Sequence, residues 1–522
     1  MNYQDLFRVT LPETALEIAA LLVLVVDLGF LRKAALRLRV AIAALIGVVG
    51  CAASMAAIGM QVGLGLYVYG APVLDNGGAG AVAQMGILAL TALTLFLLVG
   101  SDFTKHVGEY VAVVLMAATG GLIVAVAQDL LVIFIGLELL SLGLYILTAF
   151  AKSSGKSAEA AVKYYLFGGM SAAFLLFGFS YLYGLSGSTN LYKIASGVYA
   201  ASILGASPLL YLALVMIAVG LGFKVAAVPF HLWAPDVYEG APAPAAAFIA
   251  SVSKVASFAL LISISNALFV CSFSGNHEIG LLLRTHTQFP KYPGAATQWM
   301  MILFVLSAAS MVLGNLAALA QVSVRRLLAY SAIAHAGYIL LGVAFVAAFS
   351  GPGTHADQAS PVWDETAVLY YVLTYGLTTI GAFAAVAVVE RATGSDRLDA
   401  FLGLHKRNPL LAAVLLVLFL SLAGIPPLVG FWAKFNLFAA VLAVGAGSIP
   451  FALVALAIAM SAVSLYYYLQ VLKRAYVLPP IDPSPIEPHP VTMLLLVGIA
   501  AAVILLGCFP AVLQNWIASF YA

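Results

Sequence analysis

The chain has 522 residues, of which 64% are hydrophobic and only 8% are charged, and its formal net charge is +2. An average globular protein has about 25% charged residues, and no soluble fold can cover this much apolar surface. The composition therefore indicates a polytopic membrane protein, and the small net charge argues against a nucleic-acid partner.

The apolar segments predict transmembrane helices rather than a barrel. They are about 20 residues long, the length of a membrane-spanning helix, and they lack the ten-residue alternation of barrel strands. We predict an all-α protein with about fourteen spans. In chain order they cover residues 11–31, 40–60, 82–100, 108–127, 129–151, 159–184, 208–230, 243–271, 297–320, 325–349, 364–390, 409–445, 448–472 and 490–517.

The basic residues are distributed unevenly between the two sides of the predicted bundle. With the N-terminus outside, sixteen of the 23 Lys and Arg residues lie in or beside cytoplasmic loops and four lie on the outer side. Cytoplasmic loops carry an excess of Lys and Arg, so both termini are expected outside. The three remaining basic residues, Lys224, Lys254 and Lys434, all lie inside predicted spans.

Two spans are interrupted by prolines close to one of these lysines. The seventh span carries Lys224 and breaks at Pro229, whereas the twelfth breaks at Pro426 and Pro427, before Lys434. Proline removes a backbone hydrogen bond and bends a helix. Irregular backbone at membrane depth is tolerated where it lines a protein cavity. Each break is therefore a candidate ion path.

The two breaks lie five spans apart, and an odd repeat length inverts the second copy in the membrane. Interrupted helices at matching positions of two halves are typical of inverted-repeat transporters. We therefore predict four parts: a three-helix N-terminal segment (1–105), a first five-helix unit (106–272), a second, inverted five-helix unit (295–480) and a C-terminal helix (488–522).

The buried charges predict a line of proton carriers. A lysine in a low-dielectric interior releases its proton more readily than one in water, and a nearby carboxylate opposes that release. Glu138 would pair with Lys224 if the fifth and seventh spans touch. His335, inside the tenth span, can exchange a proton near neutral pH. The predicted line, which runs along the membrane plane, is Glu138, Lys224, Lys254, His335 and Lys434.

Each of these residues also has a structural interpretation. A lysine in a span can snorkel to the interface or bond to a carbonyl, and Glu138 can cap a neighbouring helix. His335 can be a packed histidine. His231, beside Pro229, can relay protons or cap the broken helix end. Lys163, one turn inside its span, fits an interfacial lysine or a proton relay.

Other chemical motifs are not found in the sequence. The three cysteines are scattered, and neither a CxxC motif nor a His/Cys cluster occurs, so we predict neither a disulfide framework nor a metal site. The absence of a Walker or dinucleotide fingerprint argues against nucleotide binding and redox chemistry in this chain. The neighbouring Tyr466, Tyr467 and Tyr468 are expected to be packing or interface residues.

One segment identifies a family. VPFHLWAPDVYEGAPAPAAAFIASVSKVASF closely resembles the subunit N family of bacterial respiratory complex I (NADH–quinone oxidoreductase), one of its three antiporter-like subunits. GLELLSLGLYILTAF, VRRLLAYSAIAHAGYILLG and SLAGIPPLVGFWAKF resemble it too, so the resemblance covers nearly the whole chain. Related subunits usually have an Ala-His-type sequence in place of VYEG, and one has Glu in place of Lys434. Both differences favour subunit N.

The resemblance implies a fold and a set of site residues. It implies fourteen helices with both termini on the periplasmic side of the bacterial inner membrane. It also implies that Glu138, Lys224, Lys254 and Lys434 transfer protons and that Lys163 lies near their path.

The resemblance further implies a translocase that couples electron transfer from NADH to quinone to proton pumping. Other subunits would carry out the redox chemistry with NADH, FMN, iron–sulfur clusters and quinone, and no cofactor is expected in this chain. The implied partners are the lipid bilayer, sister antiporter-like subunits and small membrane subunits.

Two alternatives remain open. The chain can be a subunit of a multi-subunit cation/proton antiporter, which would use the same fold and lysines with an ion gradient as the driving force. It can also be a non-pumping structural membrane subunit. Its complete set of buried charges argues against the second alternative, because a subunit that no longer pumps has no reason to retain them.

Overall fold

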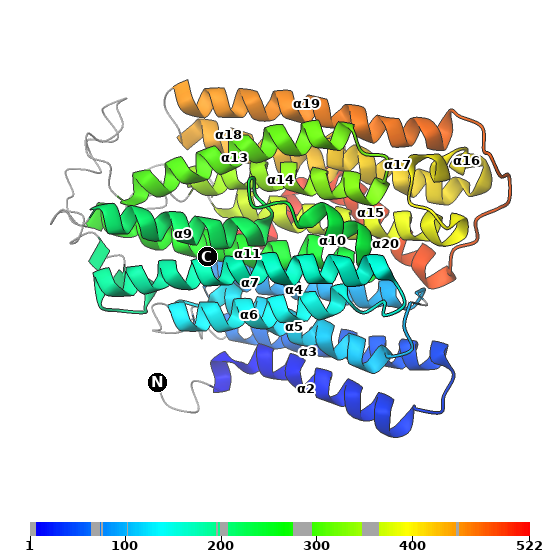
Figure 1. The fold of residues 1–522 in the computed structure, drawn as a ribbon, viewed down its shortest axis with the longest axis horizontal. Coiled ribbons are helices and arrows are strands. Elements are labelled where there is room, and N and C mark those ends of the chain that lie inside the picture. Colours follow the sequence, from blue (N-terminus) through cyan, green and yellow to red (C-terminus); the bar gives the residue numbers. More distant parts are fainter. Residues whose placement is uncertain are drawn as a thin grey trace.

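The computed structural model describes residues 7–63, 74, 77–101, 103–194, 197–198, 207–274, 295–346, 365–444 and 448–521. Its long helices run along one common direction and form a single bundle (Figure 1). The described backbone has no strands beyond isolated bridges in loops. The predicted all-α membrane fold is confirmed.

The N-terminal helices match the first three predicted spans. The first span continues from an α-helix into a short π-helix that contains Asp27, whose carboxylate receives two hydrogen bonds from Arg39, of 2.7 and 2.6 Å. The elements are α2 (Leu11–Val25), the π-helix η1 (Val26–Phe30), α3 (Leu36–Gly63) and α4 (Gly78–Leu98).

Among the described residues, six helices make up the part predicted to be the first unit. Helices α5 and α6 are joined by a short connection, as the adjoining predicted spans 108–127 and 129–151 require, and Asp129 caps α6 by accepting a hydrogen bond of 2.9 Å from Leu131 N. The helices are α5 (Val107–Val126), α6 (Leu130–Thr148), α7 (Gly155–Ser186), α9 (Ser207–Val225), α10 (Ala234–Gly240) and α11 (Ala243–Ser274).

The remaining chain contains the second broken helix and the C-terminal helices. The elements are α13 (Ala295–Leu319), α14 (Val324–Val346), α15 (Glu365–Thr393), η3 (Leu398–Phe401), α16 (Leu404–Arg407), α17 (Pro409–Ala423), α18 (Val429–Val444), α19 (Ser448–Tyr476), α20 (Pro490–Cys508) and α21 (Pro510–Ala518).

Twelve of the described helices are long and apolar enough to cross a membrane. The two other predicted spans are each divided into two pieces, α2 with η1 and α17 with α18. The last span also differs from the prediction, because α20 ends at Cys508 and α21 begins at Pro510. Proline disfavours helical geometry in the preceding residue, and Phe509 has φ −127° and ψ 64°.

Three helices form the centre of the bundle. In α11, α14 and α15, 94% of the residues in the apolar segment that could span the membrane are buried. The corresponding share is 33% in α7 and 22% in α19. These three central helices carry Lys254, His335 and the residues around them. The outer helices expose apolar side chains, as expected of surfaces that meet lipid or other membrane subunits.

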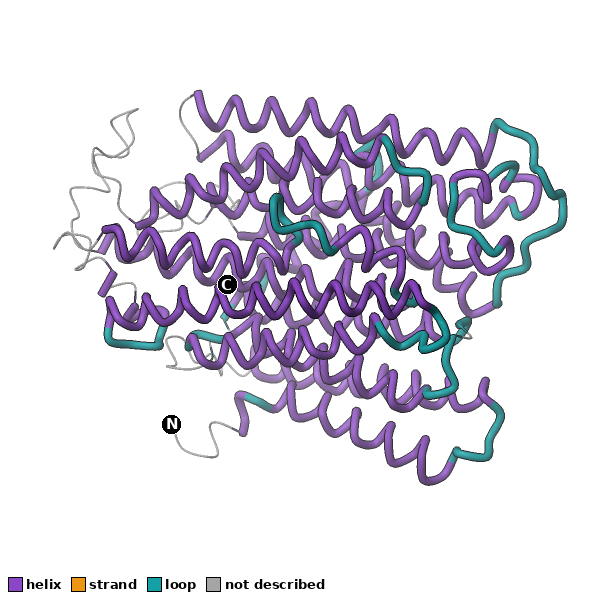
Figure 2. The backbone as a smooth tube through the Cα atoms, in the orientation of Figure 1, coloured by secondary structure: helices purple, strands orange, loops and turns teal. Residues whose placement is uncertain are grey.

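The two broken helices run in opposite directions. Helices α9 and α18 lie toward one end of the bundle, and α10 and α17 lie toward the other (Figure 1). The break between α9 and α10 appears as a loop in the middle of the bundle (Figure 2). This arrangement is the one expected of an inverted pair.

Arg284 and Lys291, two of the four basic residues assigned to the outer side, lie outside the described residues, as does the side chain of Cys271. Cys51 is buried and Cys508 is exposed, and both are free thiols.

Candidate functional site

The break between α9 and α10 begins before Pro229, the proline at which the sequence predicted it. Helix α9 ends at Val225, and Ala226 adopts a positive φ of 58°. The indole of Trp233 holds the break by donating a hydrogen bond of 3.0 Å to the Phe223 carbonyl and by stacking on Tyr164 at 4.4 Å between ring centroids. The backbone is therefore fixed at a point where no helix continues.

Lys224 lies in the last turn of α9. Its side chain is 7% exposed, and its ammonium donates a hydrogen bond to the Ser141 hydroxyl on α6. The C-terminal end of a helix carries partial negative charge and unpaired carbonyl groups. The position therefore favours a cation even though it is buried.

Glu138 lies on α6, one turn before Ser141, and is close enough to Lys224 to act on it electrostatically. No direct ion pair joins Glu138 to Lys224, because the Lys224 ammonium bonds to Ser141 instead. Among the described residues, Glu138 has no ion pair within 4.0 Å. The sequence alone does not indicate Ser141, because its contact with Lys224 depends on α6 lying beside the end of α9.

Lys254 lies in the middle of α11 and is only 2% exposed. Its ammonium donates a hydrogen bond of 2.6 Å to the Ala332 carbonyl on α14 and lies 5.7 Å from the centroid of the Tyr375 ring on α15. A buried ammonium needs acceptors or an aromatic face to replace water. Lys254 has both.

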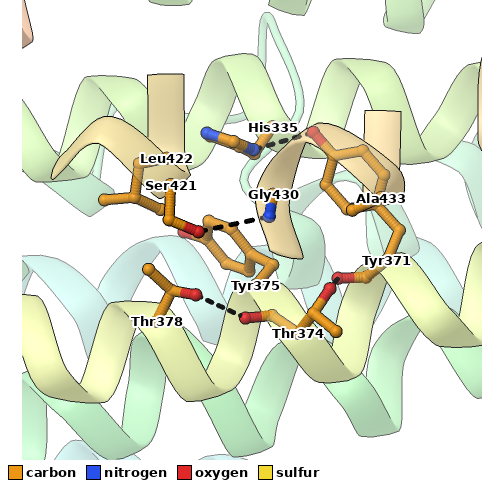
Figure 3. Close-up of a pocket in the computed structure, with 9 residues that line it drawn as sticks. All are labelled: His335, Tyr371, Thr374, Tyr375, Thr378, Ser421, Leu422, Gly430 and Ala433. Atoms are coloured by element: carbon orange, nitrogen blue, oxygen red, sulfur yellow. Dashed lines mark hydrogen bonds between the residues drawn. The ribbon is translucent and has the colours of Figure 1, made fainter. Parts of the chain in front are cut away.

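His335 on α14 follows Lys254 in the predicted line of proton carriers. Its Nδ1 lies 2.9 Å from the Tyr371 hydroxyl (Figure 3), and its ring centroid is 4.9 Å from that of Tyr375 and 5.8 Å from that of Tyr338. A small cavity adjoins the ring and has room for about one water molecule. Its polar lining residues are His335, Tyr371, Thr374, Tyr375, Thr378 and Ser421.

Lys434, on α18, bonds to the end of the preceding half-helix. Its ammonium donates hydrogen bonds of 2.9 Å to the Ala423 carbonyl and 2.8 Å to the Ser461 hydroxyl, and it lies 5.4 Å from the Tyr338 ring centroid. Gly424 ends α17 with φ 89°, and a Cβ there would lie 3.0 Å from the Lys434 side chain. The glycine therefore permits both the turn and the close approach of the lysine.

A hydrogen bond connects the two halves of the second broken helix. The Gly430 amide on α18 donates a hydrogen bond of 3.2 Å to the Ser421 hydroxyl on α17 (Figure 3). The peptide bond between Pro426 and Pro427 is cis, as is the one between Val228 and Pro229 in the first break.

Together these contacts form a continuous line from Lys254 to Lys434. Tyr375 contacts both Lys254 and His335, and Tyr338 contacts both His335 and Lys434. In the described part of the chain, no hydrogen bond or ring contact joins Lys224 to Lys254, although their helices α9 and α11 pack together. The predicted order of carriers thus includes one step without a direct contact.

Lys163 does not lie on this line. Its ammonium is 2.7 Å from Asp236 on α10 and 2.7 Å from Glu159 on its own helix α7, and its side chain is 40% exposed. Asp236 also accepts a hydrogen bond of 2.7 Å from Arg326 on α14. Lys163 therefore belongs to a cluster that connects the two predicted units.

The other residues of this cluster bond to the C-terminal end of α10. Glu239 pairs with Lys156 at 3.0 Å and with Arg326 at 3.1 Å. Arg325 donates to the Glu239 carbonyl at 2.8 Å and the Ala241 carbonyl at 3.0 Å, at the C-terminal end of α10. We call Lys156, Glu159, Lys163, Asp236, Glu239, Arg325 and Arg326 the charged clamp, since it holds α10 between α7 and α14.

His231 lies within the first break and is 6% exposed. Its Nδ1 is buried and has no hydrogen-bond partner among the described residues. It does not cap a helix through that atom, and no described contact joins it to the lysine line.

Sequence analysis missed the tyrosines of the line, although a signal was available. Tyr371, Thr374, Tyr375 and Thr378 recur at helical spacing in an otherwise apolar span and form one polar stripe. The prediction that the tyrosine triplet consists of packing or interface residues fits all three, and Tyr466 is the exposed member at 59%. Tyr467 and Tyr468 are buried, and their hydroxyls bond to Asn315 and Ser331.

Comparison with known proteins shows the family. The family model described as "NADH:quinone oxidoreductase/Mrp antiporter, TM" matches residues 127–282 and 277–461. A protein of Acidobacterium capsulatum named NADH-quinone oxidoreductase subunit N 2 is 46% identical over 527 residues, which cover 99% of both chains. The subunit N of Moorella thermoacetica is 37% identical, covering 94% of this chain and 93% of that protein.

Solved structures show the same fold. A chain of respiratory complex I from Thermus thermophilus is 31% identical, with a TM-score of 0.74 and coverage of 97% of this chain and 99% of that chain. A chain of the Mrp complex from Dietzia has a TM-score of 0.76 with coverage of 98% and 97%, but at 20% identity it supports the fold alone.

Proposed function

The chain belongs to the NADH:quinone oxidoreductase/Mrp antiporter family of membrane subunits, and from this premise we propose that it translocates protons as a subunit of NADH–quinone oxidoreductase. The relatives from Acidobacterium capsulatum and Moorella thermoacetica, which match nearly its whole length, are named subunit N of that enzyme. The chain is then one part of a translocase, in which oxidation of NADH and reduction of quinone supply the driving force.

The redox groups belong to other subunits in this proposal. NADH, FMN, iron–sulfur clusters and quinone would be used elsewhere in the complex, and this chain would contact sister antiporter-like subunits, small membrane subunits and lipid. We place it in the bacterial inner membrane with both termini on the periplasmic side, because the basic residues favour that orientation.

The observation that carries the proposal is the buried line of Lys254, Tyr375, His335, Tyr338 and Lys434. Ionisable residues inside a membrane are expensive to bury, and they mark ion and proton paths. Three groups that exchange protons, separated by hydroxyl-bearing rings, lie in the most buried part of the bundle.

These residues can move charge by mutual repulsion. In a low-dielectric interior, a proton on one site disfavours a proton on its neighbour, so the sites titrate jointly. A proton that arrives on Lys254 would favour release from His335 or Lys434. Glu138 acts in the opposite direction on Lys224, because its carboxylate stabilises the ammonium. Moving that carboxylate away, or protonating it, would release the Lys224 proton.

A cation/proton antiporter subunit remains the main alternative, because the family model covers both kinds of complex. Membrane vesicles that contain the assembled complex distinguish the two functions. We expect NADH oxidation to drive proton uptake that stops with a quinone-site inhibitor, and we expect an imposed sodium or potassium gradient to drive none. Proton movement that follows the cation gradient and is independent of NADH would contradict the proposal.

A further inference from the structure

A buried acid lies outside the lysine line, in the three helices before the first unit. Glu13 on α2 is 5% exposed, and Gln84 on α4 is 1% exposed. The Gln84 Nε2 donates a hydrogen bond of 2.9 Å to Glu13 Oε1 and one of 3.2 Å to the Leu122 carbonyl on α5. The pair therefore joins three helices.

The orientation of the amide is set by its surroundings. The Leu122 carbonyl can only accept a hydrogen bond, so it requires the NH₂ group of Gln84 on its side. With the amide held this way, Gln84 Oε1 and Glu13 Oε2 are both buried, and neither has a hydrogen-bond partner among the described residues. Two buried acceptors without a donor are unfavourable.

We propose that Glu13 and Gln84 form a proton-binding site in which the carboxyl of Glu13 is neutral at neutral pH. A protonated carboxyl supplies the missing donor: Glu13 Oε2–H donates to Gln84 Oε1 while Gln84 Nε2 donates to Glu13 Oε1. Carboxylic acid and amide then satisfy each other in a reciprocal pair. An ionised Glu13 would leave both oxygens without a donor in a buried site.

The neighbouring charges favour a site that can also release its proton. Glu17, one turn further along α2 and exposed, disfavours a second negative charge. The first turn of α2, where Glu13 lies, favours an anion through the helix dipole. Helix α4 has no charged residue, and the charged residues of α3 and α5 (Arg37, Arg39 and Glu109) lie in the first turns of those helices. Asp27 in η1 is paired with Arg39.

The position of the pair links it to the lysine line. Helix α4 packs against α11 and α15, which carry Lys254 and Tyr375, and Leu122 belongs to the first predicted unit. Helix α4, which carries Gln84, therefore lies between Glu13 and the helix that carries Lys254. The use of the Glu13 proton during turnover rests on the proposed function, whereas the neutral state of Glu13 does not.

Infrared spectroscopy of the assembled complex in membranes tests the proposal, because protonated and ionised carboxyl groups absorb at different frequencies. At neutral pH we expect Glu13→Gln to remove a carboxylic acid C=O band. The matched control is Glu17→Gln, an exposed glutamate on the same helix, which should leave the carboxylic acid band of Glu13 in place. Gln84→Leu should shift the acid band, since the carbonyl of Glu13 loses its N–H donor.

Loss of a carboxylate band in Glu13→Gln would overturn the proposal. So would failure of that variant to assemble while Glu17→Gln assembles, because glutamine has nearly the shape of a neutral glutamic acid. For use in turnover, we expect fewer protons pumped per NADH oxidised in Glu13→Gln than in Glu17→Gln. An equal ratio would overturn that use and leave the function proposed for the lysines intact.

Discussion

The two broken helices both place a lysine ammonium beside unpaired backbone carbonyls, but the lysine comes from a different half-helix in each. In both, an ammonium lies at the C-terminal end of the first half-helix, where carbonyl groups have lost their helical partners. Lys224 belongs to that end, since it lies in the last turn of α9. Lys434 belongs to the second half-helix, α18, and reaches back to the Ala423 carbonyl at the end of α17.

The charges around the two lysines differ. Lys224 has Glu138 within electrostatic range and the charged clamp on the next half-helix. Lys434 has only neutral acceptors, the Ala423 carbonyl and the Ser461 hydroxyl, among the described residues. The charge of Lys224 can therefore be controlled by a carboxylate, whereas that of Lys434 depends on the positive groups along the line through His335. The breaks share a backbone design and differ in electrostatic control.

Removing the first lysine tests this difference most strongly. Lys224→Ala should reduce NADH-driven proton pumping about tenfold or more, equivalent to about 1.4 kcal/mol in activation free energy. The exposed Lys193 provides a control, Lys193→Ala, which should pump normally. Glu138→Gln should lower pumping as well, because the carboxylate no longer influences Lys224. Normal pumping in an assembled Lys224→Ala complex would disprove the role of the first break.

A second test asks whether the sign of the charge matters at the second break. Lys434→Ala should reduce pumping strongly, and we expect Lys434→Glu to retain more activity, since a carboxyl group can still carry a proton there. Pumping rates in vesicles with matched amounts of assembled complex provide the measurement. Equal loss in both variants would show that this position requires a cation.

Ser141 and Ser461, which accept hydrogen bonds from Lys224 and Lys434, allow a matched comparison of the two breaks. Ser141 is the only described hydrogen-bond acceptor of Lys224, whereas Lys434 keeps the Ala423 carbonyl when Ser461 is removed. Hydrogen bonds to charged groups contribute about 1.5–3 kcal/mol, so Ser141→Ala should slow pumping more than Ser461→Ala. If the two variants slow pumping equally, the alternative acceptor at Lys434 does not matter.

The charged clamp should have the smallest effect. Asp236→Asn removes the carboxylate shared by Lys163 and Arg326. Partly exposed ion pairs contribute little and are screened by salt, so we expect a change of a few fold at most in pumping that diminishes at high ionic strength. A large effect that is independent of salt would show that α10 depends on this carboxylate for more than its position.

The sequence predicted the breaks and the buried lysines well, because charges and prolines are rare and conspicuous in apolar spans. It missed the groups that these lysines bond to, such as Ser141 and the Ala332 carbonyl. Their roles depend on which helices are neighbours, and spacing along one chain does not determine that. The ion pairs of Asp236 with Lys163 and Arg326 could not be predicted either, because they depend on α10 lying between α7 and α14.

In the proposed function, protons pass along the line that begins at Lys254. Lys254→Met keeps a long, flexible side chain but removes the charge and the proton. Proton uptake and NADH oxidation should be measured together in vesicles that contain the fully assembled variant complex. We predict that both rates fall together by about tenfold or more, the effect of about 1.4 kcal/mol on a rate-limiting step. Wild-type rates with an unchanged ratio of protons to NADH would show that protons do not pass through Lys254.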